Sequence, residues 1–225
     1  MLKYVIAFFL AAVISYLLGS CNSAIITVKL MKHVDVRDYG SKNAGLTNTL
    51  RCFGKVCALF TLLGDMLKGV LAVLISRGIF SWLGIGFGAD NDTRFIGYIA
   101  GIFAVIGHVF PIYYNFKGGK GILVSAAVLL AVDPLSFCIV IPFFAIVLAI
   151  TRYVSVASIS AAVIYPFVTF FTQYFRSSYT LAQASLNTVF VVITSIMLIY
   201  MHRTNIKRLK NGTENKFSFG KSRKE

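Results

Sequence analysis

The sequence predicts an all-α integral membrane protein with seven transmembrane helices. Of its 225 residues, 57% are hydrophobic and only 13% are charged, about half the charged fraction of a typical soluble domain. The apolar residues are gathered in long blocks, and about 20 residues are needed to cross a bilayer as a helix. Because no linker or internal repeat separates the blocks, we expect a single domain over residues 1–225. The seven blocks, of which the fourth is short, are residues 4–28, 56–76, 93–113, 118–132, 134–150, 154–174 and 184–201.

The first block imitates a lipoprotein signal peptide, with Lys3 before the apolar run and Cys21 after it. However, the apolar run resumes at Ala24, and the positive charges Lys29 and Lys32 follow the run rather than precede it. We therefore expect a retained first transmembrane helix.

Two further segments adjoin the first two blocks. The small and polar residues from Gly19 to Ala24 close the first block, and small residues let a helix pack closely on its neighbour. The apolar piece 79–88 extends beyond the second block, and we expect it at the membrane interface.

Basic residues outnumber acidic ones by 22 to 8, which gives a net charge of +14. They lie in loops between apolar blocks, so membrane topology and the anionic leaflet explain them, and no nucleic acid partner is expected. One side of the membrane collects most of these charges together with the C-terminal tail. The positive-inside rule therefore places the N-terminus outside and the C-terminus in the cytoplasm. The other side holds only Lys3, Arg77, Arg94 and Arg176.

The four cysteines contain no Cys-x-x-Cys pair, and suitably spaced histidines are missing, so a zinc site is not expected. We read them as small buried apolar residues or incidental thiols. No metal and no cofactor are predicted.

The stretch from Gly40 to Arg51 is a glycine-spaced loop rich in hydroxyl and amide groups. Glycines let backbone N–H groups approach an anion, and a helix beginning there adds its positive dipole end. The spacing nearly matches a Walker A loop, but Leu46-Thr47 stand where that motif needs Lys-Ser/Thr. A single phosphate is therefore favoured over a nucleoside triphosphate. The expected binding residues are Gly40, Ser41, Asn43, Gly45, Thr47, Asn48 and Arg51.

A second glycine-rich segment, residues 107–121, ends in Gly118-Gly119-Lys120-Gly121 immediately before an apolar helix. Flexible backbone at a helix N-terminus combined with a point charge predicts a second anion site. The aromatic residues that flank it are more typical of an interfacial belt than of ligand stacking. The charge topology places both glycine-rich loops on the cytoplasmic side.

The C-terminal tail is the third polar segment on that side. His202 and Asn205 are three residues apart on a continuing helix and hence share one face, which could point at the site. Lys207, Arg208 and Lys210 are typical of a charge cluster that anchors the last helix.

Two other pairs of ionisable residues require an explanation. Asp65 and Lys68 lie roughly 15 Å inside the second block, where such groups are often functional. A structural pair that satisfies itself explains them equally well. His33 and Asp38 form the His-x4-Asp pattern of a different class of acyltransferases, and we interpret this short pattern as coincidence.

Together these segments resemble the acyl-phosphate:glycerol-3-phosphate acyltransferase family (PlsY) of bacterial inner membranes. They follow the family's order over nearly the whole chain, although Lys42 stands where glycine is usual and Leu46 where alanine is usual. The segments that carry the resemblance are Gly19-Ser20, Gly40–Arg51, Asp65-x-x-Lys68-Gly69, Gly107-His108 through Gly121, and His202-Arg203-x-Asn205-Ile206.

The resemblance implies a multi-pass enzyme of the bacterial inner membrane with its active site on the cytoplasmic face. It would transfer a fatty acyl group from acyl phosphate to the sn-1 hydroxyl of glycerol 3-phosphate, giving lysophosphatidic acid and phosphate in phospholipid biosynthesis. Its partners would be these two substrates, membrane lipid and the enzyme that makes acyl phosphate.

The resemblance assigns substrate binding or catalysis to Ser41, Arg51, Lys120, His202 and Asn205. Together with the local residue chemistry, it leads us to expect the following roles. Catalysis falls to Ser41, Lys120 and His202, and substrate binding to the loop residues above together with Gly118, Gly119, Lys120 and Asn205. Supporting roles fall to Asp65, Lys68 and His108.

The implied chemistry agrees with the residue types. An acyl phosphate is an activated mixed anhydride, so the enzyme needs alignment and charge neutralisation rather than a covalent intermediate. The general base is either His202 or the phosphate of glycerol 3-phosphate. Two alternatives stay open: a transporter of an organic phosphate or other anion, and an acyltransferase that uses acyl-CoA or acyl carrier protein. The clustering of candidate residues on one side argues against transport.

Overall fold

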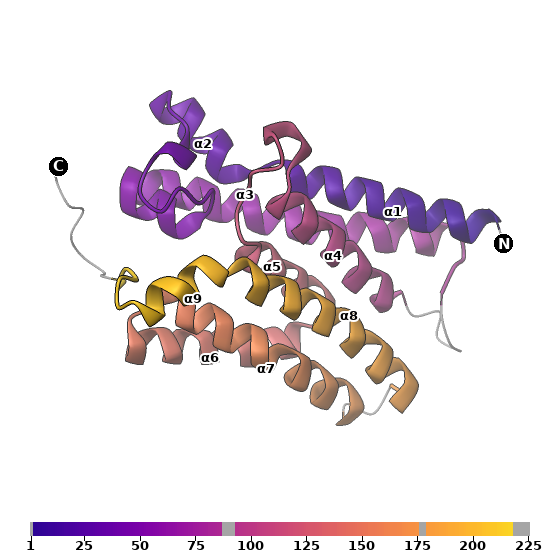
Figure 1. Ribbon diagram of the computed structural model, residues 1–225. Helices are drawn as coiled ribbons and strands as arrows, with labels where there is room; N and C mark the ends of the chain where they lie inside the picture. The colour runs from indigo at the N-terminus through magenta and orange to yellow at the C-terminus, as the bar shows by residue number, and fades with distance from the viewer. Residues whose placement is uncertain (1, 87–92, 176–178, 218–225) are drawn as a thin grey trace. The chain divides into compact units, whose positions relative to one another are not determined.

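The computed structural model describes residues 2–86, 93–175 and 179–217, so Arg176 and residues 87 and 88 lie outside the described ranges. Within these ranges every regular element is helical, as predicted (Figure 1). The chain divides into two compact units, unit 1 (Met1–Val132) and unit 2 (Asp133–Glu225). The expectation of a single domain over residues 1–225 stays a prediction.

Unit 1 is a helical bundle in which α1 packs against α3 and α4, and α5 packs against the same two helices. Its elements are α1 (Leu2–Ser20), α2 (Ser23–Lys32), the 3₁₀ turn η1 (Val36–Asp38), α3 (Leu46–Trp82), α4 (Arg94–Val109), the 3₁₀ turn η2 (Ile112–Tyr114) and α5 (Ile122–Val132).

Unit 2 places α7 against both α6 and α8. Its elements are α6 (Pro134–Thr151), α7 (Val154–Phe175), α8 (Leu181–Met201) and α9 (Arg203–Lys210).

The first apolar block forms two helices rather than one. Asn22 has an extended backbone, and its side-chain oxygen accepts a hydrogen bond from the N–H of Ile25, so it caps the new helix α2. The predicted close packing at this point is confirmed, because a side chain at Gly19 would collide with the backbone of Ala104 in α4.

Helix α3 is bent at Gly54, where φ is 82° and ψ is −177°. These angles lie in a region that is essentially restricted to glycine. The bend separates a short helix, residues 46–53, from a long apolar helix, residues 55–82. It sets the direction of the short helix, which carries Thr47 and Arg51 of the first glycine-rich loop.

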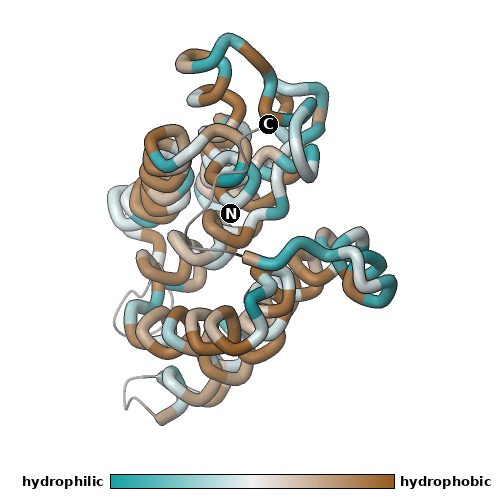
Figure 2. Tube along the Cα trace, turned by 90° about the vertical axis from the view of Figure 1, so that its left-hand side faces the viewer, coloured by the Kyte–Doolittle hydropathy of each residue, from teal (hydrophilic) through white to brown (hydrophobic). Residues whose placement is uncertain are grey.

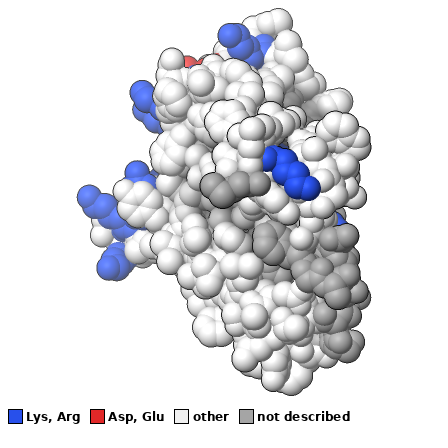
Figure 3. Space-filling model, turned by 90° about the vertical axis from the view of Figure 1, so that its right-hand side faces the viewer, with Lys and Arg blue, Asp and Glu red and all other residues white. Residues whose placement is uncertain are grey.

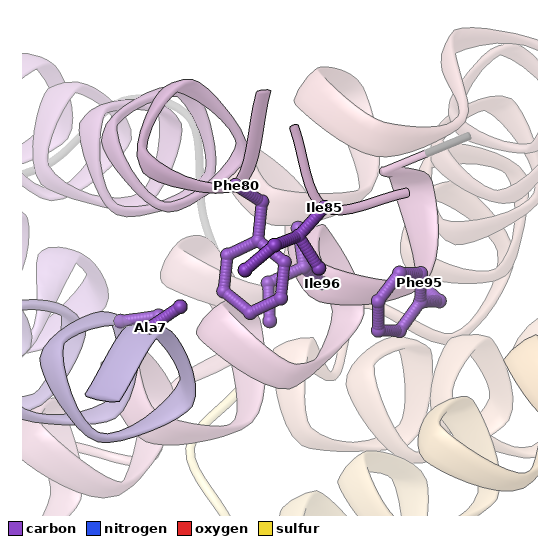
Figure 4. Close-up of a cluster of buried hydrophobic side chains, with 6 residues drawn as sticks. Ala7, Phe80, Ile85, Phe95 and Ile96 are labelled. Atoms are coloured by element: carbon purple, nitrogen blue, oxygen red, sulfur yellow. The ribbon is translucent and has the colours of Figure 1, made fainter. Parts of the chain in front are cut away.

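One apolar core of unit 1 joins α1, α3 and α4 (Figure 4). Phe80 and Ile85 are completely or almost completely buried, so the described part of the 79–88 piece packs in this core. These side chains fill the space beside the small residues Ala7 and Ala11 of α1. Such packing does not fix their depth in a membrane, so the interfacial location stays a prediction.

Within the described residues, six helical segments are long and apolar enough to cross a membrane, counting α1–α2 as one segment and α4–η2 as another. The fourth predicted block, α5, has only 11 residues, about 16 Å against a hydrocarbon core of about 30 Å. Seven spans and the orientation of the termini therefore stay predictions. Hydrophobic positions dominate the helices in Figure 2, and few Lys, Arg, Asp or Glu side chains are visible on the face shown in Figure 3.

Buried polar contacts connect the helices of unit 2. The Asp133 carboxylate caps α6 through the N–H of Ser136 at 3.1 Å and accepts a hydrogen bond from the Ser136 hydroxyl at 2.6 Å. Gln173 of α7 donates to Asp133 at 3.5 Å and accepts from Asn187 of α8 at 3.0 Å. In a low-dielectric environment such a satisfied network fixes how these helices pack.

We predict that Gly54→Ala will destabilise the protein by about 1–3 kcal/mol and reduce the acyltransferase activity expected from the sequence, because alanine disfavours the backbone angles at the bend. Gly78→Ala, in the regular part of the same helix, is the matched control; a Cβ at either position would meet no atom within 4 Å. Thermal unfolding in detergent and turnover should separate the two variants. Equal behaviour would contradict the role of the bend.

Candidate active site

The first glycine-rich loop is folded around the side chain of Asn48. The Asn48 Oδ1 atom accepts hydrogen bonds from the backbone N–H of Ser41 at 2.9 Å and from its hydroxyl at 3.1 Å. The Asn48 Nδ2 group donates to the carbonyls of Val36 and Tyr39 at 3.2 and 3.0 Å. Asn48 was expected to bind phosphate directly, but it is buried and donates its amide hydrogens to the protein. It shapes the loop and orients Ser41.

The other residues of this loop surround the start of α3. Gly40 lies against Asn48, and Gly45 is the N-cap of α3, so Thr47 falls in the first helical turn. Asn43 and Thr47 are half-buried. Arg51 is exposed, and its side chain pairs with no partner among residues 2–86, 93–175 and 179–217. A helix N-terminus stabilises anions, and anion binding by this loop stays a prediction.

The second glycine-rich loop is fastened to the end of α4. The N–H groups of Gly118 and Gly119 donate to the carbonyls of Val109 and His108, each at 3.1 Å. A Cβ at Gly118 would collide with the His108 carbonyl, and one at Gly119 with the His108 ring and the Ala44 carbonyl. The glycines are therefore required for close packing. Lys120 follows, half-buried, two residues before α5 begins.

The structure brings the two glycine-rich loops together. The close approach of Gly119 to the Ala44 carbonyl joins them directly, and Asn22 donates to the same carbonyl at 3.3 Å. Arg37 adds a second link, because its Nη1 group donates to the carbonyls of Tyr114 and Lys117 at 2.9 and 3.1 Å.

Arg37 is held in place by Asp35, whose carboxylate lies 2.6 Å from the guanidinium group. The hydrogen bond from Arg37 lowers the pKa of Asp35, and the same bond raises the pKa of Arg37. Sequence reasoning missed both Arg37 and Asn22 as loop organisers. The small polar cluster around Asn22 was a usable signal, but the acceptors of Arg37 are 77 and 80 residues away along the chain.

Asp65, Lys68 and His108 form a buried cluster beneath the second loop. The Lys68 ammonium lies 2.8 Å from the Asp65 carboxylate, 2.9 Å from Nδ1 of His108 and 3.0 Å from the Cys21 carbonyl. All three side chains of the cluster are at most 5% exposed. Asp65 and Lys68 thus form a buried ion pair, and Lys68 also contacts a histidine that lies against a glycine-rich loop.

The third predicted segment lies in unit 2. His202 and Asn205 are both buried around the junction of α8 and α9. Nδ1 of His202 is 2.8 Å from the Leu198 carbonyl. Because a carbonyl only accepts hydrogen bonds, Nδ1 carries the proton, and a neutral His202 has its lone pair on Nε2.

Glu214 fastens the chain after α9 back onto unit 2. It accepts hydrogen bonds from Asn205 at 2.7 Å, Ser155 at 3.0 Å and Arg208 at 2.7 Å. Burial raises the pKa of Glu214, but these hydrogen bonds outweigh burial, and the pKa lies below its ordinary value of 4.5. Sequence reasoning missed Glu214, although it is one of only two acidic residues in a basic tail, which was a usable signal.

Across the described parts of the chain, no three His, Cys, Asp or Glu side chains are grouped closely enough to hold a metal ion. The His33–Asp38 pattern gains no support as a catalytic pair. His33 is the exposed, left-handed C-cap of α2, and its backbone N–H bonds to Lys29.

A helical fold with several apolar segments of spanning length is typical of an integral membrane protein, and its joined cationic, glycine-rich loops form a candidate anion site. The family model described as glycerol-3-phosphate acyltransferase matches residues 9–212. The chain belongs to this family.

Curated relatives agree. A glycerol-3-phosphate acyltransferase of Chlorobaculum tepidum is 38% identical over 96% of this chain and 99% of its own length. One of Fusobacterium nucleatum is 40% identical over 95% of this chain and 100% of its own length.

Two solved structures share the fold. One is the glycerol 3-phosphate form of PlsY (YgiH), an integral membrane glycerol 3-phosphate acyltransferase, with 31% identity and a TM-score of 0.77 over 94% of this chain and 96% of that one. The other, its lysophosphatidic acid form, has 30% identity and a TM-score of 0.76 over 94% and 95%.

We predict that Glu214→Gln will lower the thermal unfolding midpoint at neutral pH, because the lowered pKa means that the carboxylate stabilises the fold. That contribution is complete above pH 4.5 and is lost as the pH falls further through the lowered pKa of the folded state. The gap between wild type and Glu214→Gln should therefore close in acid. Asp38→Asn, which removes an exposed carboxylate, is the control. A gap independent of pH would contradict this account.

Proposed function

We propose that the protein transfers a fatty acyl group from acyl phosphate to the sn-1 hydroxyl of glycerol 3-phosphate, releasing lysophosphatidic acid and inorganic phosphate. The glycerol-3-phosphate acyltransferase family fixes the acceptor. The donor is the part that this proposal adds.

The observation that carries the proposal is the junction of the two glycine-rich loops in unit 1. Ala44 and Gly119 meet there, and Arg37 bonds the second loop from the side of the first. Each loop adjoins a helix N-terminus and carries cationic side chains. Two neighbouring anion-binding elements suit a reaction in which both substrates bear a phosphate.

The chemistry requires little beyond positioning and charge neutralisation. The sn-1 oxygen forms a bond to the acyl carbon, the bond from that carbon to the phosphate oxygen breaks, and phosphate leaves with the electron pair. The proton of the hydroxyl passes to a base. Because the mixed anhydride is already activated, aligning the two substrates removes much of the barrier.

We assign roles on the family resemblance and the local geometry. Ser41, oriented by Asn48, binds the acceptor together with Arg51, and Lys120 neutralises a phosphate. His202 acts as the general base, because its neutral ring carries the lone pair on Nε2. Asn205, oriented by Glu214, binds substrate.

We further propose that the chain crosses the bacterial inner membrane seven times, with α5 as a short crossing beside α3 and α4. The positive-inside distribution supports an external N-terminus and places both glycine-rich loops on the cytoplasmic face. The enzyme that makes acyl phosphate would then supply the donor from that side.

The donor is tested with purified protein given glycerol 3-phosphate and, in separate reactions, palmitoyl phosphate, palmitoyl-CoA or palmitoyl acyl carrier protein. We expect lysophosphatidic acid from the acyl phosphate and none from the thioesters. Mass spectrometry of the product and a phosphate-release assay report both halves of the reaction. Product from a thioester at a comparable rate would overturn the proposed donor.

Arg51→Lys should raise the KM for glycerol 3-phosphate by about tenfold or more, because an ammonium cannot reproduce the two parallel hydrogen bonds of a guanidinium group to phosphate. Arg94→Lys is the matched control, since Arg94 is exposed at the end of α4 remote from His108. An unchanged KM in Arg51→Lys would remove Arg51 from the binding site.

A further inference from the structure

The ammonium group of Lys68 has three close polar neighbours and three hydrogens to give them. The neighbours are the carboxylate of Asp65, the Cys21 carbonyl and Nδ1 of His108, at 2.8, 3.0 and 2.9 Å. An ammonium group donates hydrogen bonds and accepts none. Nδ1 of His108 is therefore an acceptor and carries no proton, so the neutral ring has its N–H on Nε2.

The Nε2 end of the ring is directed at the second glycine-rich loop. A Cβ added to Gly119 would collide with Nε2 of His108 and with the Ala44 carbonyl. Nε2 thus lies beside Gly119 at the junction of the two loops, one residue before Lys120. The backbone of His108 holds the same residue, since its carbonyl accepts the N–H of Gly119 at 3.1 Å.

The cluster is fixed to three separate parts of unit 1. Asp65 and Lys68 belong to α3, His108 belongs to α4, and the Cys21 carbonyl follows α1. Because the cluster is at most 5% exposed, its ionic contacts are little screened by solvent. A shift of His108 would break a contact of the buried ammonium.

We propose that His108 is a positioning residue of the acyltransferase: Lys68 and Asp65 fix its ring with the N–H on Nε2, and this end of the ring sets the place of Gly119 and Lys120 at the loop junction. The proposal deepens the proposed function, because it takes this junction as the place where the phosphates bind. The i,i+3 pair in α3 then acts on the site through His108 and touches no substrate.

The tautomer can be measured directly by ¹⁵N NMR of histidine-labelled protein in detergent. The chain has only three histidines, so signals lost in His108→Gln identify the ring. We expect a neutral His108 with its proton on Nε2. A proton on Nδ1 in the wild-type ring would overturn the proposal whatever the donor of the reaction, since this measurement involves no substrate.

Two substitutions of His108 distinguish a role in positioning the second loop from a role that only gives Lys68 a hydrogen-bond acceptor. The amide of Asn can accept from Lys68 at the place of Nδ1 but does not reach Gly119, whereas the amide of Gln reaches the place of Nε2. For His108→Asn we expect a near-normal unfolding midpoint with a loss of kcat/KM of about tenfold or more. His108→Gln should be less stable than His108→Asn but should retain more of the wild-type kcat/KM.

A purely structural role predicts the reverse order, with His108→Asn active and His108→Gln impaired in both stability and turnover. That result would overturn the proposal. Turnover is measured with whichever acyl donor the wild type accepts, so failure of the proposed donor is seen separately, in the wild type.

Removing Lys68 alone would leave the Asp65 carboxylate buried without its counter-charge and risks unfolding. The double variant Asp65→Leu/Lys68→Met removes both charges and leaves Nδ1 of His108 without its donor. We expect this variant to fold, to show a mixture of His108 tautomers by NMR, and to lose kcat/KM. A retained single Nε2–H tautomer with wild-type kinetics would contradict the role of the pair.

Discussion

The buried ammonium of Lys68 joins the chain after α1, helix α3 and helix α4 at one point in unit 1. A charge in an apolar interior is tolerated only when it is paired and its hydrogen bonds are made. Satisfying this one group therefore fixes three helical segments relative to one another. His108, one of its partners, also holds Gly119, so the geometry of the glycine-rich loops depends on an ion pair that lies well inside the bundle.

Close packing, rather than flexibility, explains most of the glycine in the two loops. Gly118 and Gly119 leave space for the carbonyls of His108 and Ala44. Outside the loops, Gly54 serves differently, because it accepts backbone angles that turn the short helix carrying Arg51. The Asn48 side chain donates hydrogen bonds to two backbone carbonyls of the loop region. The loops are therefore built with fixed shapes, which reduces the entropy that must be lost when a charged ligand binds.

The two buried histidines of the candidate machinery are set to opposite tautomers by their neighbours. The Leu198 carbonyl demands a proton on Nδ1 of His202, whereas the Lys68 ammonium excludes one from Nδ1 of His108. His202 thus has a basic nitrogen at Nε2, and His108 has a donor there. The residue type alone could not separate these roles, because the tautomer depends on which atom of a distant residue faces each ring nitrogen.

The sequence by itself determined the helical membrane class, the order of the apolar blocks and the two glycine-rich loops, because these follow from local composition and from turn and charge chemistry. It did not determine that the Asn48 side chain is hydrogen-bonded within the loop, that Arg37 joins the loops, or that Phe80 and Ile85 are core residues. Those outcomes depend on contacts between residues far apart in the chain. Burial favours such contacts, because a buried polar group without a hydrogen-bond partner is costly and the partner is supplied only by the folded chain.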